Sequence, residues 1–246
     1  GQVLVHALAD AGYHVGFTGA YAHTEYKEDG MMGGYRPTRA LETIKAVTTC
    51  LGITDEQTSA RVWVDFISQN YIDAMHKNIL SIDTFYNVIT HLADITGRVS
   101  QGVELINYLR ERTEHITNQV QGLPRPRVLY VMGTPLFVLN EDRFENDMVR
   151  AAGGEPLNRN FPRKGKPGIM ISPDDLNQID PEIIIMSGFL STPVEDAYII
   201  CKEKGIDIQA VRNRKIYAMH PSWDFGNPRW ILGLSFLAQV LHPDEI

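Results

Sequence analysis

The sequence predicts an α/β protein, and three observations lead to this fold class. Residues 127–246 alternate short aliphatic runs with helical patterns, which is typical of a mostly parallel sheet covered by helices on both faces. Residues 98–121 repeat apolar residues along one side of a long helix. Between these two regions, Pro124 and Pro126 break the chain, and the alternating pattern starts afresh after them.

The composition is that of an ordinary globular protein. The chain has 246 residues, of which 43% are hydrophobic and 22% charged, enough apolar material for a buried core. This length suits one large domain or two compact lobes, and both remain open at this point. The formal net charge of -7 leaves no large basic surface for a phosphate backbone, so we expect no nucleic-acid partner.

One basic cluster interrupts this acidic balance. It consists of Arg159, Arg163, Lys164 and Lys166. We expect a solvated loop here, with contact to an anionic ligand as the alternative.

Neither the cysteines nor the apolar runs indicate a redox centre or a membrane span. Cys50 and Cys201 lie far apart, so a zinc ribbon or a thioredoxin-like site has no support. No apolar stretch reaches the ~20 residues that span a bilayer. Residues 1–12 carry none of the features of a signal peptide, and the chain as given is expected to be a mature or trimmed form.

The first half reads as helices around a glycine-rich loop and a short strand. The loop covers residues 23–37, where glycines, tyrosines and methionines suit a surface that approaches a ligand closely. The long helix would span roughly 36 Å at 1.5 Å per residue, which could connect two lobes or lie on the surface of one domain. The expected elements are helices at 2–12, 38–51, 82–95 and about 98–121, an extended segment at 13–21, and a strand at 62–66.

The second half supplies the ligand-binding edge of the predicted sheet, because ligands bind at loops that follow the carboxyl ends of parallel strands. Those loops are expected at 133–138, 187–191 and 220–228, and we select Met132, at the end of the first strand, and Phe137 as ligand-binding candidates. The expected elements are strands at 127–132 and 183–186, apolar segments at 206–211 and 215–219, and helices at 142–152, 173–179, 193–204 and 229–241.

Catalytic and metal-binding motifs are absent. The sequence has no glycine-rich dinucleotide or phosphate fingerprint, no nucleophile elbow and no metalloprotease helix. None of the eight histidines forms an H-x-H or an i, i+4 pair. We therefore expect no metal site made by the protein alone and no covalent cofactor.

The loop at 220–230 is the most informative stretch for function. Aromatic residues alternate with proline, glycine and one arginine, which suits a flat or apolar ligand that carries anionic groups. We select His220, Trp223, Phe225 and Arg229 as ligand-binding candidates. The alternative is that the aromatic rings pack the last helix, and for Trp230 we favour that alternative.

The second half resembles the substrate-binding proteins of ABC importers for iron-siderophores, haem and vitamin B12, the class III periplasmic binding proteins. The resemblance lies in FENDMVRAAGG at 144–154, ISPDDL at 171–176 with DPEIII at 180–185, and VRNRKIY at 211–217 with NPRWILGL at 227–234. It continues upstream in LADITG at 92–97 and in GGY at 33–35 with Glu42.

This resemblance implies two Rossmann-like lobes joined by one long helix, with a ligand cleft between them. The lobes would be residues 1–97 and 123–246, and the helix residues 98–122. Members of the family dock onto arginines of the membrane permease through an acidic residue on each lobe. Glu42 matches the first of these positions, and Asp174 falls where the second lobe usually has Glu.

The resemblance also bears on the ligand and on the start of the chain. Tyr35 matches a position that supplies an axial oxygen to haem iron in one branch, although stacking on a siderophore remains open. The family opens with a strand and a proline-containing loop, whereas this chain begins within what resembles the first helix. The first lobe is therefore expected to lack its opening strand or to be rebuilt.

The function that follows is capture of a metal chelate without chemistry. Tyr35, Trp223 and Phe225 would cover the apolar faces of a ferric siderophore, haem or corrinoid, and Arg36 or Arg229 would meet its anionic groups. The protein would be a monomer, periplasmic or lipid-anchored on the outer face of the cytoplasmic membrane, and would deliver its ligand to an ABC permease. A chelatase-like enzyme on the same architecture and a protein-interaction module are the alternatives.

Overall fold

The computed structural model of the protein describes residues 46–53, 81–161, 168–188, 192–224 and 228–246. The chain divides into two compact units, and the division crosses the long helix α7 between Tyr108 and Leu109. The domain limits expected from the sequence stay predictions.

The first unit is helical in its described part. It contains most of α6 (Ile82–Ile95), the first half of α7 (Val99–Val120) and a helical segment at 46–50. Phe85, Ile89 and Leu92 form the buried stripe of α6, at the spacing that places side chains on one helical face. Both long helices confirm the sequence prediction.

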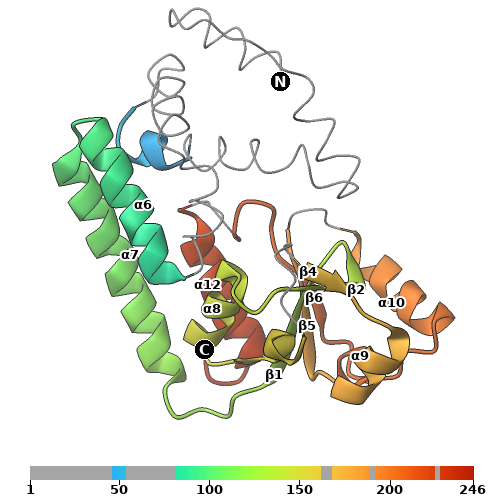
Figure 1. The fold of residues 1–246 in the computed structure, drawn as a ribbon. Coiled ribbons are helices and arrows are strands. Elements are labelled where there is room, and N and C mark those ends of the chain that lie inside the picture. The colour runs from blue at the N-terminus through green and yellow to red at the C-terminus, as the bar shows by residue number, and fades with distance from the viewer. Residues whose placement is uncertain (1–45, 54–80, 162–167, 189–191, 225–227) are drawn as a thin grey trace, which may run out of the picture. The chain divides into compact units, whose positions relative to one another are not determined.

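The second unit is an α/β layer structure (Figure 1). After the second half of α7, its elements are β1 (Arg127–Met132), β2 (Thr134–Leu139), α8 (Phe144–Ala151), β3 (Glu155–Pro156), the 3-10 helix η2 (Leu157–Asn160), β4 (Gly168–Met170), α9 (Pro173–Ile179), β5 (Ile183–Met186), α10 (Val194–Glu203), α11 (Gln209–Arg212), β6 (Ile216–Ala218) and α12 (Trp230–Leu241).

The six described strands form one mixed sheet, in which five follow the order β4-β2-β1-β5-β6 and β3 pairs with β1 off this path. The strands β1, β5 and β6 run parallel, with Leu129 opposite Ile184 and Ile185 opposite Tyr217. The strands β2 and β4 are antiparallel to their neighbours. The prediction of a mostly parallel sheet is therefore right for the central strands and wrong for the β2 and β4 side.

The expected ligand loop at 133–138 is instead strand β2, which corrects the sequence prediction. Gly133 has a φ of +70°, so the chain reverses directly after β1 and pairs back onto it. The register shifts between Val131 and Met132, and Pro135 lies in this irregular stretch. A residue without an N–H is tolerated there because the ladder is already interrupted.

One edge of β1 is shared by two partners, and a buried asparagine fills the gap between them. β3 pairs with Arg127 and Val128, and β2 pairs near Val131 and Met132. Between these pairs, Tyr130 N–H donates to Asn158 Oδ1 at 3.0 Å, and Asn158 Nδ2 donates to Tyr130 O at 2.8 Å. The side chain thus replaces a missing strand partner, because a buried peptide group must find one.

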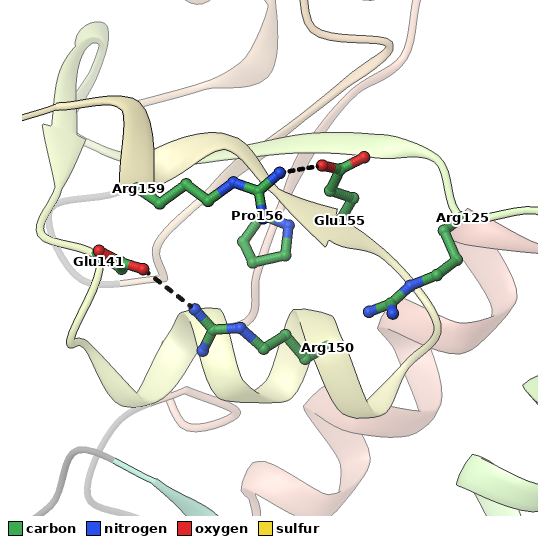
Figure 2. A pocket seen from close by; sticks show the side chains of 6 residues that line it. All are labelled: Arg125, Glu141, Arg150, Glu155, Pro156 and Arg159. Atoms are coloured by element: carbon green, nitrogen blue, oxygen red, sulfur yellow. Dashed lines mark hydrogen bonds and ion pairs between the residues drawn. The ribbon is translucent and has the colours of Figure 1, made fainter.

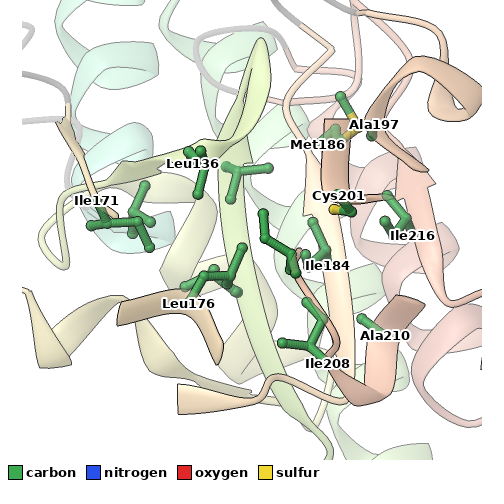
Figure 3. Packing of buried hydrophobic residues seen from close by; sticks show 14 of the residues in the cluster. Leu136, Ile171, Leu176, Ile184, Met186, Ala197, Cys201, Ile208, Ala210 and Ile216 are labelled. Atoms are coloured by element: carbon green, nitrogen blue, oxygen red, sulfur yellow. The ribbon is translucent and has the colours of Figure 1, made fainter. Parts of the chain in front are cut away.

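Helices cover both faces of the sheet (Figure 1), and Figure 3 shows the apolar cluster on one of them. Successive side chains of a strand point to opposite faces, so alternate residues enter different layers. The core on one face lies under α9, α10 and α11, and its members include Leu129, Val131, Ile184, Met186, Leu176, Ala197, Cys201, Ile208, Ala210 and Ile216. On the opposite face, α8 and α12 pack together, and the rings of Phe144 and Trp230 meet edge to face at 5.5 Å.

The apolar segment at 206–211 forms no strand, in contrast to its β-like composition. Ile206 and Ile208 are buried, and a helical turn, α11, follows. Asp180 directs this turn, because its carboxylate accepts hydrogen bonds from Gln209 N at 2.7 Å and Gln209 Nε2 at 3.0 Å. Burial opposes ionisation of Asp180, but these bonds and the charges of Arg212 and Arg127 outweigh it and lower the pKa of this carboxyl.

Candidate functional site at the strand ends

The carboxyl ends of the three parallel strands lie side by side in the second unit. Ser187 N donates to Val131 O at 2.8 Å, which extends the pairing of β5 with β1. Met219 N donates to Met186 O at 2.8 Å, which does the same for β6 and β5. The loops that follow β5 and β6 therefore start from adjacent positions, as the sequence predicted for a ligand-binding edge.

A buried carboxylate joins these two loops. Asp224 Oδ2 accepts hydrogen bonds from Ser187 Oγ at 2.6 Å and from Gly188 N at 2.9 Å. Asp224 is 1% exposed, so these hydrogen bonds form where water does not compete. The loop that starts at Ser187 and the loop residues 220–224 are thereby held together, although Gly188 and Asp224 lie 36 positions apart in the sequence. We call these two joined loops the platform.

The platform presents a histidine and a tryptophan side by side. His220 is exposed and Trp223 half-buried, and their ring centroids are 5.1 Å apart with planes inclined by 36°. Trp223 N donates to His220 O at 2.9 Å, which closes the turn between them. Together they make an aromatic surface with polar nitrogens at its edge.

The surroundings of His220 indicate which ring nitrogen can face a ligand. Ser222 N donates to His220 Nδ1 at 3.2 Å, so Nδ1 acts as an acceptor. The neutral ring then carries its proton on Nε2. In this tautomer Nε2–H is a hydrogen-bond donor and not a metal ligand.

Helix α12 supports Trp223 from the other side. The indole lies 6.1 Å from the ring of Phe236, which in turn meets Tyr217 edge to face at 6.5 Å. Gly233 faces the main chain of the loop, because a Cβ there would lie 2.1 Å from Trp223 O. The two readings of Trp223, ligand contact and packing on the last helix, are therefore compatible.

The other residues that the sequence analysis discussed in the second half of the chain lie at different places in the structure. Met132 is buried at the carboxyl end of β1, and Arg229 is exposed just before α12. Phe137 lies within β2 beside Gly168 of β4, and so not in a loop at this edge. Trp230 is fully buried, which confirms its predicted packing role.

Other predicted residues fall elsewhere or outside the description. Asp174 is exposed in the first turn of α9, where Ser172 and Asp175 form a reciprocal N-terminal cap. Four predicted residues lie outside the described residues: Tyr35, Arg36, Glu42 and Phe225.

Sequence reasoning missed Ser187 and Asp224. The available signal was a single acidic residue in an aromatic loop directly after a strand, which is unusual for a solvated carboxylate. No sequence pattern indicates that Ser187, in the loop after β5, is the hydrogen-bond partner of Asp224.

Within the described ranges, no cluster of three or more histidine, cysteine or acidic residues could hold a metal ion. Across that same part of the chain, no helix combines the length and apolar character needed to cross a bilayer.

Several solved structures share this fold. An ABC transporter substrate-binding protein from Listeria monocytogenes EGD-e is 20% identical, with a TM-score of 0.56 over 67% of this chain and 66% of that chain. CeuE of Helicobacter pylori with Ni(II) bound is 18% identical, with a TM-score of 0.58 over 67% and 53%. IsdE of S. aureus, complexed with haem, is 24% identical, with a TM-score of 0.53 over 66% and 65%.

The likeness to these structures shows the fold, and the chain spans about half to two thirds of their length. No curated protein matches the sequence. The sequence does match the periplasmic binding protein family over residues 58–222. The chain therefore belongs to the periplasmic binding protein family.

Proposed function

We propose that this protein, as a monomer outside the cytoplasm, captures a metal chelate and delivers it to an ABC permease. The observation that carries the proposal is the pair His220 and Trp223 on the loop after β6, which Asp224 joins to the loop after β5. Membership of the periplasmic binding protein family supports a solute-binding role, and similar structures hold haem or nickel.

The chemistry of the platform favours a flat or aromatic ligand with oxygen groups at its rim. The exposed side of the Trp223 ring offers an apolar contact, and His220 Nε2–H would donate to a carboxylate, catecholate or hydroxamate oxygen. Arg229, exposed at the start of α12, would meet an anionic group. Haem, ferric siderophores and corrinoids fit this description, and Tyr35, Arg36 and Phe225 remain proposed contacts.

The first test is a titration of the full chain with haemin, a ferric catecholate, a ferric hydroxamate and cobalamin, one at a time. A bound chelate should quench tryptophan fluorescence stoichiometrically and be recovered unchanged. Trp223→Ala should weaken binding about tenfold, since a ring against a ligand contributes on the order of 1–2 kcal/mol beyond its neighbours. Release of an altered product would point to an enzyme instead.

Controls distinguish the platform from the general surface. His220→Ala should weaken binding, whereas His115→Ala, at an exposed position of α7, should leave it unchanged. Equal effects of the two substitutions, or no binding of any of the four chelates, would contradict the proposal. A Soret band that shifts in wild type and not in Tyr35→Ala would identify haem and its ligand.

The second test concerns delivery. We propose that Glu42 and Asp174 contact the permease, because Asp174 is exposed and both match docking positions of the resembling family. Glu42→Lys and Asp174→Lys should reduce uptake by membranes containing the permease without changing chelate affinity. Glu203→Lys, an exposed control on α10, should do neither.

A further inference from the structure

Figure 2 shows a pocket lined mainly by charged side chains. It lies at the amino end of β1, whereas the platform lies at the carboxyl end of the sheet. It has a volume of about 510 Å³, within the usual range for small-ligand sites. Its lining residues are Arg125, Glu141, Arg150, Glu155, Pro156 and Arg159. Glu155 pairs with Arg127 at the amino end of β1, so the length of that strand, roughly 17 Å, separates the pocket from Met132.

The frame of this pocket is made by main-chain hydrogen bonds. Glu155 N donates to Pro126 O at 2.8 Å, and Gly154 N donates to Val149 O at 2.9 Å. Arg125 Nη2 donates to Gly154 O at 2.9 Å, which brings its guanidinium group to the rim. Main-chain hydrogen bonds therefore hold the backbone around the pocket, and the Arg125 side chain adds one further bond to it.

The charge of the pocket is opposite to that of the protein. Three arginines against two glutamates give a net charge of +1 among its lining residues, in a chain with a formal net charge of -7. Arg159 belongs to the one basic cluster that stands out in the sequence. A positive concave site on an acidic protein attracts anions selectively.

The glutamates hold two of the arginines only weakly. Arg150 Nη2 lies 4.0 Å from Glu141 Oε1, with 40% and 53% of the two side chains exposed. Arg159 on η2 forms an ion pair and a hydrogen bond with Glu155 on β3, four residues earlier, again at the surface. Exposed pairs of this kind contribute about 0–1 kcal/mol, so a multiply charged anion can displace the carboxylates.

We propose that this pocket binds a small soluble di- or polyphosphate. Its guanidinium groups come from three separate segments, namely the chain before β1, helix α8 and helix η2 (Figure 2). A tetrahedral phosphate presents oxygens in several directions and can accept from all three, whereas a planar carboxylate is matched by one guanidinium fork. The site is separate from the chelate platform and does not depend on the proposed function.

The test is isothermal titration of the full chain with sodium pyrophosphate at low ionic strength. Wild type should bind saturably, and Arg125→Gln and Arg150→Gln should each weaken binding at least about tenfold, since hydrogen bonds to charged groups are lost. Glu141→Gln should tighten binding about threefold, because a competing carboxylate is removed. A gain of affinity cannot be caused by misfolding.

The matched control is Arg112→Gln, which removes an exposed arginine of α7 that does not line the pocket. It should bind pyrophosphate like wild type. Absence of saturable binding by wild type up to about 10 mM, or equal weakening by Arg112→Gln and Arg150→Gln, would overturn the proposal. Equal competition by citrate would overturn the assignment to phosphate.

Discussion

Replacing Gly233 with alanine tests how closely α12 packs against the loop that carries Trp223. Two effects oppose each other. Alanine in a helix interior is more favourable than glycine by about 1 kcal/mol. However, the new Cβ would lie 2.1 Å from Trp223 O, a main-chain atom that no rotamer change can move aside. Relief of such a contact requires a shift of more than about 1 Å, and overpacking of this kind costs about 1–3 kcal/mol.

The contact should prevail over the helix propensity, because 2.1 Å is well inside any normal carbon–oxygen distance. At the upper end of the overpacking cost, and after the gain in helix propensity is subtracted, we expect the free energy of unfolding to fall by about 2 kcal/mol. For a chain of this size the loss corresponds to a fall in Tm of about 4–8 °C. The fluorescence of Trp223 should also change, because the loop must move away from the helix.

Urea unfolding followed by circular dichroism measures the first effect, and the native emission spectrum measures the second. Ser235→Ala is the control, since it lies two residues further along α12, where its hydroxyl donates only to Ile231 O. The control should be at least as stable as wild type. A Gly233→Ala protein that is as stable as wild type, with an unchanged spectrum, would refute the reasoning.

Three further substitutions or reactions are expected to give measurable results. Ser187→Ala removes a hydrogen bond to the buried carboxyl group of Asp224 and should lower the free energy of unfolding by about 1–3 kcal/mol in urea, because a buried acceptor loses a partner. Burial raises the pKa of the Cys201 thiol to about 11, so it should not react with a disulfide reagent at pH 8 until the protein unfolds. Because the pKa of Asp180 is lowered in the folded protein, its ionised form stabilises the fold at pH values above the ordinary carboxyl pKa. This stabilisation is lost as the pH falls through the lowered pKa of the native state. Gln209→Ala should raise the pKa of Asp180, which an NMR titration of the carboxyl would measure.

Each of these predictions has a contrasting outcome. Ser222→Ala, which affects only an exposed hydrogen bond to His220, should cost little, so an equal loss would weigh against the buried carboxylate as the cause. Cys50 is exposed and should react in the native protein, and rapid reaction of both thiols would contradict the inert Cys201. An unchanged titration midpoint in Gln209→Ala would show that its side chain does not lower the pKa of Asp180.

Long elements with strong periodicity were predictable, and short ones were not. The range 82–95 was predicted for α6 and 127–132 for β1, and both bounds agree with the structure, because a stripe or an apolar run spans the whole element. The strands β3 and β4 have two and three residues, too few to show alternation. The sequence predicts a loop where the structure has strand β2, because the reversal at Gly133 needs no intervening turn sequence.

The adjacency of the loops after β5 and β6 was predictable from the sequence, and the contact that joins them was not. A parallel sheet places ligand loops at the carboxyl ends of its strands, and the aromatic composition of 220–230 selected Trp223 and His220. The bond from Ser187 to Asp224 joins residues 37 positions apart, and only the register of β5 against β6 brings them together. Such a pairing is a property of the folded chain and leaves no local pattern.

The carboxylate of Asp224 also bears on how such a protein could acquire a new ligand. Because its bonds to Ser187 and Gly188 point inward, the side chains at 220, 222 and 223 can change without loosening the link between the loops. Substitutions at positions 220, 222 and 223 could thus change which ligand is selected, while the hydrogen bonds of Asp224 beneath them stay the same. Variation among relatives should then concentrate on the outward residues and spare the inward acid.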